Sequence, residues 1–179
     1  MKLDRPIEST RLRLRALTPA DVTDRYVSWL GDVEVTRYLE VRFTEQTVAS
    51  VSAYVQQMNA SPDDLLLGIF LKDAGDHIGN IKLGAVDRNH GRAEVGIVIG
   101  DRASWGKGFA TEAIAALTGH AFEALDLHKV SCGLYEANEA SRRAFLKAGW
   151  FEEGRRRQHW SCDGAWLDDV QMACIRNTG

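Results

Sequence analysis

Residues 94–112 read Glu-Val-Gly-Ile-Val-Ile-Gly-Asp-Arg-Ala-Ser-Trp-Gly-Lys-Gly-Phe-Ala-Thr-Glu, and they contain the strongest local pattern in the chain. From Arg92 to Ile99, the apolar residues Ala93, Val95, Ile97 and Ile99 occupy every second position, and most of them are β-branched. This period of two predicts a strand. From Ala110 onward the apolar residues recur at helical spacing, which predicts a helix. A glycine-rich turn joins the two, so unpaired backbone N–H groups should lie at the positive end of the helix dipole. Such a corner is a favourable place for phosphate oxygens.

Two common phosphate-binding motifs do not fit this corner. A P-loop needs two glycines five positions apart, followed by Lys and then Ser or Thr. Here Gly100 and Gly106 are six positions apart, and Gly108 follows Lys107. A dinucleotide fingerprint needs a third glycine, where this chain has Thr111. A nucleotide-binding corner of another fold is therefore disfavoured.

The corner resembles the acyl-CoA loop of the GNAT N-acetyltransferase superfamily. That loop reads Arg or Gln, two residues, Gly, any residue, then Gly or Ala, and Gly108-Phe109-Ala110 matches its end. The run Gly-Lys-Gly-Phe-Ala-Thr-Glu-Ala is typical of the branch resembling ribosomal-protein N-terminal (alanine/serine) acetyltransferases. The chain departs from the pattern at Trp105, where the family has Arg or Gln. An ordinary strand–turn–helix corner is the structural alternative.

A second match to the family begins at Asn138. The family shows Asn, a small residue three positions on, an aromatic residue four beyond that, and Gly-Phe soon after. Asn138, Ser141, Phe145 and Gly149-Trp150 fall at those spacings. In the family the Asn orders the start of a helix and contacts the pantetheine arm, whereas the plain alternative is a helix N-cap. Both roles are compatible with each other.

Phe145 is the informative departure in this second motif. Many family members carry Tyr there, as the acid that protonates the departing CoA thiolate, and Phe cannot donate a proton. Either Ser141 or Tyr135 substitutes, or solvent and the nearby helix N-terminus assist the thiolate. As a structural residue, Phe145 is simply part of the core.

The chemistry implied by the resemblance needs a neutral amine, because an ammonium has no lone pair with which to attack a thioester. A lysine-like amine with a pKa near 10.4 is mostly protonated at neutral pH, so a general base is expected. Glu94 is the first candidate, since it lies on the opposite strand face from Val95, just before the loop. Asp87 and His90 resemble turn residues and are weaker candidates. A solvated strand carboxylate is the alternative for Glu94.

The family's acyl-CoA arm pairs with the exposed edge of the central strand, and its phosphates lie at the loop. Lys107 and Arg102 could neutralise those phosphates. The full set expected to contact acetyl-CoA is Ile97, Val98, Ile99, Arg102, Trp105, Gly106, Lys107, Gly108, Phe109, Ala110, Thr111, Asn138, Ser141, Arg143 and Phe145.

Composition sets broad limits. The chain has 179 residues, 45% of them hydrophobic and 26% charged, which suits one soluble domain over residues 1–179. A formal net charge of −3 gives no support for direct nucleic-acid binding. Three cysteines without CxxC spacing indicate neither a disulfide framework nor a metal site. No apolar run suggests a signal region or a membrane span, so a cytoplasmic protein is expected.

The periodicity predicts a strand at Glu8–Arg15, helices that start at Thr18 and Thr44, and strands on either side of the turn at residues 73–76. The central strand and helix follow, then a short strand, a helix that ends at Gly149, and a final hairpin. This order is that of the GNAT fold: a single α/β domain with about four helices and a mixed, mostly antiparallel sheet of about seven strands. The resemblance implies that this sheet splays at its centre.

The leading functional hypothesis is an acetyl-CoA-dependent enzyme that transfers an acetyl group directly to a primary amine. The acceptor would be a protein N-terminal α-amine or a small amino compound. The alternatives are a non-catalytic acyl-CoA-binding module and an amino-sugar N-acetyltransferase of surface polysaccharide synthesis. The expected partners are acetyl-CoA and the amine acceptor, and homodimer formation is left open. The run Arg155–Arg157 is typical of a solvated hairpin face; as a functional feature it would suit an acidic substrate or nearby ribosomal RNA.

Overall fold

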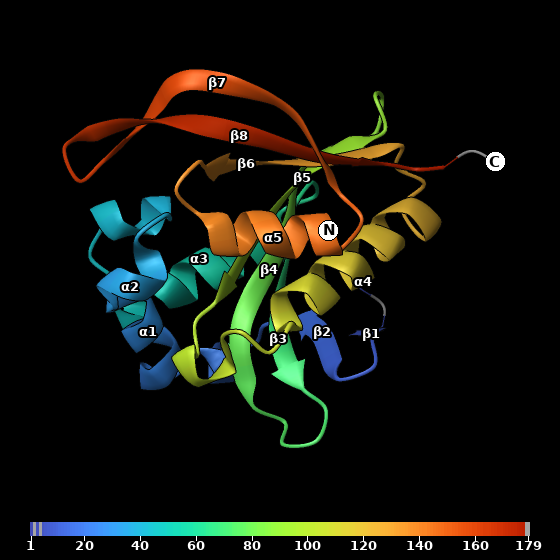
Figure 1. The fold of residues 1–179 in the computed structure, drawn as a ribbon. Coiled ribbons are helices and arrows are strands. Elements are labelled where there is room, and N and C mark those ends of the chain that lie inside the picture. The colour runs from blue at the N-terminus through green and yellow to red at the C-terminus, as the bar shows by residue number, and fades with distance from the viewer. Residues whose placement is uncertain (2, 4, 178–179) are drawn as a thin grey trace.

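The computed structural model describes residues 1, 3 and 5–177, which form one eight-stranded sheet with helices on both faces (Figure 1). The strands lie in the order β1-β2-β3-β4-β5-β6-β8-β7. All neighbouring strands are antiparallel except β5 and β6. The strands are β1 (Ile7–Glu8), β2 (Leu12–Ala16), β3 (Leu65–Leu71), β4 (His77–Asp87), β5 (Arg92–Ile99), β6 (Lys129–Tyr135), β7 (Phe151–Cys162) and β8 (Ala165–Ile175).

Five α-helices connect these strands: α1 (Asp24–Gly31), α2 (Val33–Thr36), α3 (Val48–Ala60), α4 (Phe109–Glu123) and α5 (Glu139–Lys147). Three short 3-10 helices are η1 (Pro19–Asp21), η2 (Glu40–Phe43) and η3 (Arg102–Ser104). The predicted fold class is confirmed. The extra strand arises because the predicted strand at Glu8–Arg15 is a small hairpin, in which the Ser9 N–H bonds to the Leu12 carbonyl at 2.9 Å and turns the chain. The extra helix, α2, has only four residues.

The predicted starts of the first two long helices are wrong by several residues. Thr18 and Asp21 form a capping box, in which the Asp21 carboxylate accepts from the Thr18 N–H at 2.7 Å. Only the 3-10 turn η1 follows, because the backbone leaves the helical region at Val22 (ψ 76°) and Thr23 (ψ 163°). Helix α1 starts after Thr23, whose hydroxyl accepts a hydrogen bond from the Tyr26 N–H at 3.2 Å. Helix α3 likewise starts after Thr47 rather than Thr44. Each true start still has a threonine cap, as N-cap preferences require.

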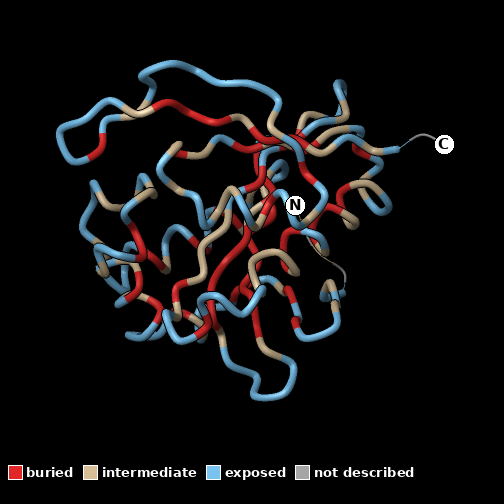
Figure 2. The backbone as a smooth tube through the Cα atoms, viewed as in Figure 1, coloured by how far each residue is buried: buried red, intermediate tan, exposed pale blue. Residues whose placement is uncertain are grey.

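The two sheet faces carry separate apolar cores. Helices α4 and α5 cover one face, and Ile114, Leu117 and Phe145 pack there almost without exposure. Helices α1 and α3 cover part of the other face around Tyr26 and Trp29. Figure 2 shows buried backbone concentrated in the central strands, whereas β7 is exposed along most of its length. Strand β7 is therefore not covered by a helix along most of its length.

The sheet splays at its centre, as expected from the resemblance. Strands β5 and β6 pair in parallel only over Arg92–Glu94 and Lys129–Ser131. Beyond Glu94, residues 95–99 of β5 stay paired with β4 alone, while β6 stays paired with β8 as far as Tyr135 and Asp169. A wedge therefore opens between β5 and β6, and one edge of β5 keeps its backbone groups unpaired.

Candidate active site

Two adjoining pockets occupy the wedge between β5 and β6. The larger pocket has a volume of about 470 Å³ and the smaller one about 200 Å³. Both are lined by Val95 and Gly96 of β5, by Gly133 of β6 and by Trp160 of β7. A Cβ atom added at Gly96 would meet nothing within 4 Å. The glycine therefore keeps the passage between the two pockets open.

Glu94 lines the larger pocket at the point where β5 and β6 part. Its side chain is exposed and makes no hydrogen bond or ion pair with any other described residue. Opposite it, the register of β4 shifts after Gly84, and Ala85 has a positive φ of 50°. Bulges of this kind commonly adjoin functional sites. Glu94 is thus a carboxylate with both oxygens available to a ligand.

Asp87 and His90 do not reach either pocket. The Asp87 carboxylate instead accepts hydrogen bonds from the backbone N–H groups of Asn89 and His90, each at 3.0 Å. These residues belong to the turn between β4 and β5, as their sequence context indicated.

The smaller pocket brings together the residues of the second sequence motif. Asn138, Ser141 and Phe145 line it from α5 and its start, and Tyr135 lines it from β6. Asn138 caps α5, because its side-chain oxygen accepts a hydrogen bond from the Ser141 N–H at 3.2 Å. Phe145 is 1% exposed and packs edge-on against Trp150, so it is both a core residue and part of the pocket wall.

Tyr135 is held by charged partners from η2. Its hydroxyl donates to Glu40 Oε1 at 2.7 Å and accepts from Arg42 at 3.1 Å. Its ring stacks on Trp160 with a centroid separation of 4.8 Å. Burial and the hydrogen bond to Glu40 raise the pKa of Tyr135 to about 12, so the phenol keeps its proton at neutral pH.

The glycine-rich loop between η3 and α4 has the geometry that the sequence predicts. Gly106 and Gly108 have φ angles of 73° and 80°, a backbone region that favours glycine. Gly108 is the N-cap of α4, and no side chain among the described residues caps that helix start. Phe109, Ala110 and Thr111 form its first turn, so their N–H groups can bind an anion.

Trp105 replaces the Arg or Gln of the family loop and ties the loop to the central strand. Its indole N–H donates to the Ile99 carbonyl at 2.7 Å, while the ring stays 41% exposed. Arg102 lies 5.5 Å from this ring and 3.5 Å from Asp32. Arg143 is exposed on α5 and lines neither pocket. Roles for Lys107, Arg102 and Arg143 toward phosphate stay predictions.

Of the β5 residues expected to bind the acyl-CoA arm, only Ile97 lines the smaller pocket. Val98 and Ile99 lie farther along the same unpaired edge, toward the loop.

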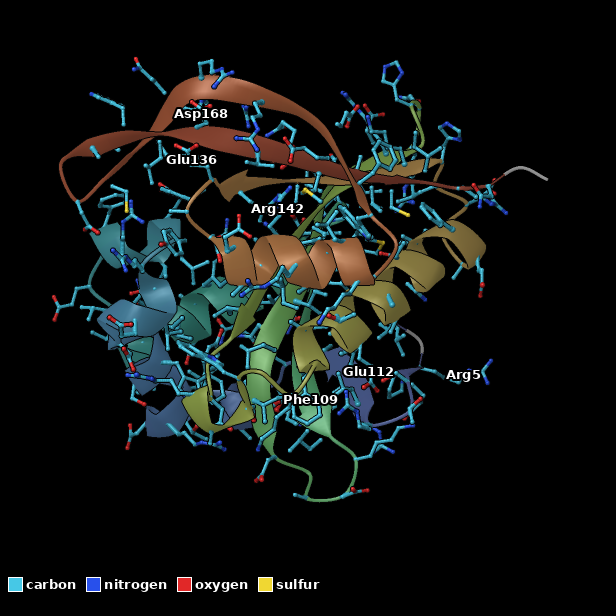
Figure 3. The ribbon with its side chains drawn as sticks, in the orientation of Figure 1. Arg5, Phe109, Glu112, Glu136, Arg142 and Asp168 are labelled. Carbon is cyan, nitrogen blue, oxygen red and sulfur yellow. The ribbon has the colours of Figure 1, made fainter. Side chains whose placement is uncertain are left out.

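Arg11 and Glu112 were not predicted to belong to the site. Glu112 lies in the first turn of α4 beside Phe109 (Figure 3), and its carboxylate accepts hydrogen bonds from the Arg11 side chain at 2.7 Å and from Ser9 at 2.8 Å. Arg11 also donates to the Lys107 carbonyl at 3.0 Å and covers the Phe109 ring at 4.5 Å. This cluster fastens β2 to the loop. The only local signal in the sequence was an acidic residue early in a helix.

The arginine run of β7 is paired with carboxylates. Arg155 contacts Glu152, Arg156 contacts Asp169, and Arg157 contacts Asp168. Of the three arginines, Arg156 alone lines the larger pocket.

Cys132 also lines the larger pocket, which the sequence did not predict. Burial, together with the nearby charges of Asp169 and Glu94, raises the pKa of the Cys132 thiol above its usual range. Because the thiolate is the nucleophilic form, Cys132 is poorly suited to carry an acyl group.

Neither a metal cluster nor a membrane helix is found in the part of the chain that the structure describes. No group of three or more His, Cys, Asp or Glu side chains there could hold a metal ion. No helix in that part is long and apolar enough to cross a membrane.

Comparisons with known proteins agree with this geometry. The family model described as "Acetyltransferase (GNAT) domain" matches residues 11–150. The uncharacterized N-acetyltransferase YoaA of Bacillus subtilis (strain 168) is 32% identical over 173 residues, which cover 95% of this chain and 96% of YoaA.

Two solved structures show the same fold at lower identity. A spermidine N-acetyltransferase from Vibrio cholerae in complex with CoA and spermine has a TM-score of 0.82 at 21% identity, covering 93% of this chain and 96% of its own. RimL, a ribosomal α-N-protein acetyltransferase in complex with coenzyme A, has a TM-score of 0.83 at 19% identity, covering 96% of this chain and 98% of the RimL chain. With a family match over most of its length and a relative above 30% identity, this chain belongs to the GNAT acetyltransferase family and is an N-acyltransferase.

Proposed function

We propose that this protein transfers an acetyl group from acetyl-CoA directly to a primary amine within the wedge between β5 and β6. The observation that carries the proposal is the pair of adjoining pockets, with the unpaired carboxylate of Glu94 on one side and the motif residues of α5 on the other. The acceptor is a protein N-terminal α-amine or a small amino compound. The structural neighbours act on both kinds of acceptor, since one is named for spermidine and another for a ribosomal protein.

The cofactor would enter from the loop side. Its pyrophosphate would bind the uncapped first turn of α4, where backbone N–H groups and the helix dipole favour negative charge. The pantetheine arm would then follow the unpaired edge of β5 past Ile97, beside Asn138 in the smaller pocket. On this path the thioester would lie near Gly96 and Gly133, which line both pockets.

The amine would approach from the larger pocket and lose a proton to Glu94. The neutral nitrogen then attacks the thioester carbonyl carbon. As the C–S bond breaks, the nitrogen gives up its second proton, which passes through a hydroxyl group of the smaller pocket to the departing thiolate, so that the amide and the CoA thiol form together. A general base of this kind contributes roughly 10²–10⁴-fold to the rate. Cys132 takes no part, because its thiol keeps its proton, and the transfer needs no acyl-enzyme intermediate.

We assign protonation of the departing thiolate to Ser141. Its hydroxyl makes no hydrogen bond to another described residue and lines the smaller pocket. The Tyr135 hydroxyl is already donated to Glu40 and would have to break that bond first. Tyr135 is the second candidate, since its raised pKa keeps a proton available at neutral pH.

Acetyl-CoA is expected to stabilise the folded protein measurably. At a concentration near 100 times Kd, a ligand that binds only the folded state adds about 2.7 kcal/mol to the free energy of unfolding. For a chain of this length, this amount raises Tm by roughly 5–11 °C. Thermal melting with acetyl-CoA, CoA and ATP as separate ligands measures the effect. Failure of both acetyl-CoA and CoA to shift Tm at millimolar concentration would contradict the proposed cofactor, and ATP should not shift it.

A further inference from the structure

We infer that the amine acceptor is a small molecule that carries a negatively charged group, a carboxylate or a phosphate, in addition to the reacting amine. The inference rests on the proposed function, because it assigns the larger pocket to the acceptor. What points to an anion is a pair of anchored cations in that pocket.

The two cations come from opposite arms of the splayed sheet. Lys82 lies on β4, where it pairs with Gly96, and Arg156 lies on β7. Both side chains line the larger pocket, as does Glu94 at the point where the strands part. The pocket therefore offers one unpaired carboxylate for an amine and two cations for a second group of the acceptor.

A buried carboxylate holds Arg156 in place. Asp169 is completely buried on β8 and accepts a hydrogen bond from Arg156 Nε at 2.7 Å and a second contact from Nη2. Gln171 donates to the same carboxylate oxygen at 2.5 Å. Arg156 Nη1 has no partner among the described residues, so it can donate to a ligand.

Lys82 is held in a similar way on the other arm. Its Nζ lies 3.3 Å from Asp64 Oδ1, and the second Asp64 oxygen accepts from the Ser61 hydroxyl at 2.7 Å. An ammonium has three donors, so this single carboxylate partner leaves others available. Both cations are thus positioned in advance, which lowers the ordering cost of binding an anion.

The charges of the larger pocket fit an acceptor with one amine and one anionic group. Of the two carboxylates that line the pocket, Asp64 pairs with Lys82, whereas Glu94 has no partner among the described residues and can meet one ammonium group. A polyamine would place its further ammonium groups beside Lys82 and Arg156, where like charges repel. A carboxylate or phosphate on the acceptor would instead bind their remaining donors through charge-assisted hydrogen bonds.

Matched acceptor pairs test the inference. Glucosamine 6-phosphate is compared with glucosamine, and serine with serinamide, with spermidine as the polycationic acceptor. Initial rates of CoA release from acetyl-CoA give kcat/KM for each. At least one anionic member is expected to exceed its neutral counterpart by about tenfold or more, the lower range for a hydrogen bond between charged groups. The phosphate and carboxylate pairs show which anion is preferred.

Three variants test which side chains cause the preference for the anionic acceptor. In Arg156→Gln and in Lys82→Gln, the ratio of kcat/KM for the anionic over the neutral acceptor should fall toward one, mainly through KM for the anionic acceptor. Arg157→Gln is the matched control, because Arg157 is also paired with a carboxylate but lies outside the pocket, and it should keep the wild-type ratio. If Arg156→Gln unfolds because buried Asp169 loses its partner, thermal melting will show it, and Lys82→Gln alone then tests the inference.

Equal or better use of spermidine or of the neutral acceptors would overturn the inference but leave the proposed function intact. An Arg157→Gln ratio that falls as far as that of the pocket variants would also overturn it. Absence of turnover with every amine would instead contradict the proposed function itself, and this inference with it.

Discussion

Replacing Gly108 with valine is expected to lower the affinity for acetyl-CoA by about 100-fold or more. Gly108 has a φ of 80° and is the N-cap of α4, where the backbone N–H groups must approach the pyrophosphate. A β-branched residue strongly disfavours this backbone region, so the loop would change its conformation. The loss corresponds to about 2.7 kcal/mol of binding free energy, which is on the order of one or two charge-assisted hydrogen bonds. Isothermal titration with acetyl-CoA measures it.

Gly75→Val is the matched control for this variant. Gly75 has a φ of 74° in the turn between β3 and β4, and an added Cβ there would meet nothing within 4 Å. Both substitutions introduce the same kind of backbone strain, so both should lower Tm by a similar amount. Only Gly108→Val should weaken acetyl-CoA binding. A folded Gly108→Val protein with wild-type affinity would show that the loop does not bind the cofactor.

Replacing Glu94 with glutamine is expected to lower kcat by roughly 100-fold or more at neutral pH. The amide cannot accept the proton of the acceptor amine, and a general base contributes on the order of 10²–10⁴-fold. The defect should shrink as the pH rises toward the pKa of the acceptor amine, because more of the amine is then neutral without assistance. The affinity for acetyl-CoA should change little, since Glu94 lines the larger pocket and not the smaller one.

Glu153→Gln serves as the control for the general base. Glu153 is also an exposed strand glutamate, but it lies on β7, pairs with Lys129 of β6 and lines neither pocket. Its substitution should leave the pH–rate profile at the wild-type level. A Glu94→Gln profile that coincides with the wild type at every pH would remove Glu94 from the mechanism.

The sequence predicted the parts of the site that lie in continuous stretches. The change from a period of two to helical spacing around Gly108 predicted the strand, the loop and the helix. Strand and helix periodicity both depend on residues close together in the sequence, so they can be recognised without the fold. The spacing of Asn138, Ser141 and Phe145 likewise fixed one wall of the smaller pocket. Glu94 was predicted from its strand face and from the chemistry that the resemblance implies; it lines the larger pocket, and its role as the base stays a prediction.

Contacts between distant strands could not be predicted in the same way. The pairs Arg156–Asp169 and Lys82–Asp64 depend on the register of β7 with β8 and on how the loop before β3 meets β4. Register is set by packing across the whole sheet, so single-residue patterns do not reveal which carboxylate faces which cation. The predicted helix start at Thr18 was wrong for a more local reason. Thr18 and Thr23 can both cap a helix, but the backbone leaves the helical region at Val22 and Thr23, so the first helical turn stops there and α1 starts after Thr23.

Direct transfer of the acetyl group from acetyl-CoA to an amine is tested by mass spectrometry of both products. The protein is incubated with acetyl-CoA that carries a deuterated acetyl group, together with glucosamine, glucosamine 6-phosphate, serine or an N-terminal peptide. The masses of the small molecules and of the intact protein are then measured. We predict that the labelled acetyl group appears on the acceptor nitrogen, with one CoA released per acetylated amine and no labelled acetyl group on the protein. A labelled acetyl group on Cys132 during turnover, or tight binding of acetyl-CoA with no acetylated amine, would contradict this account.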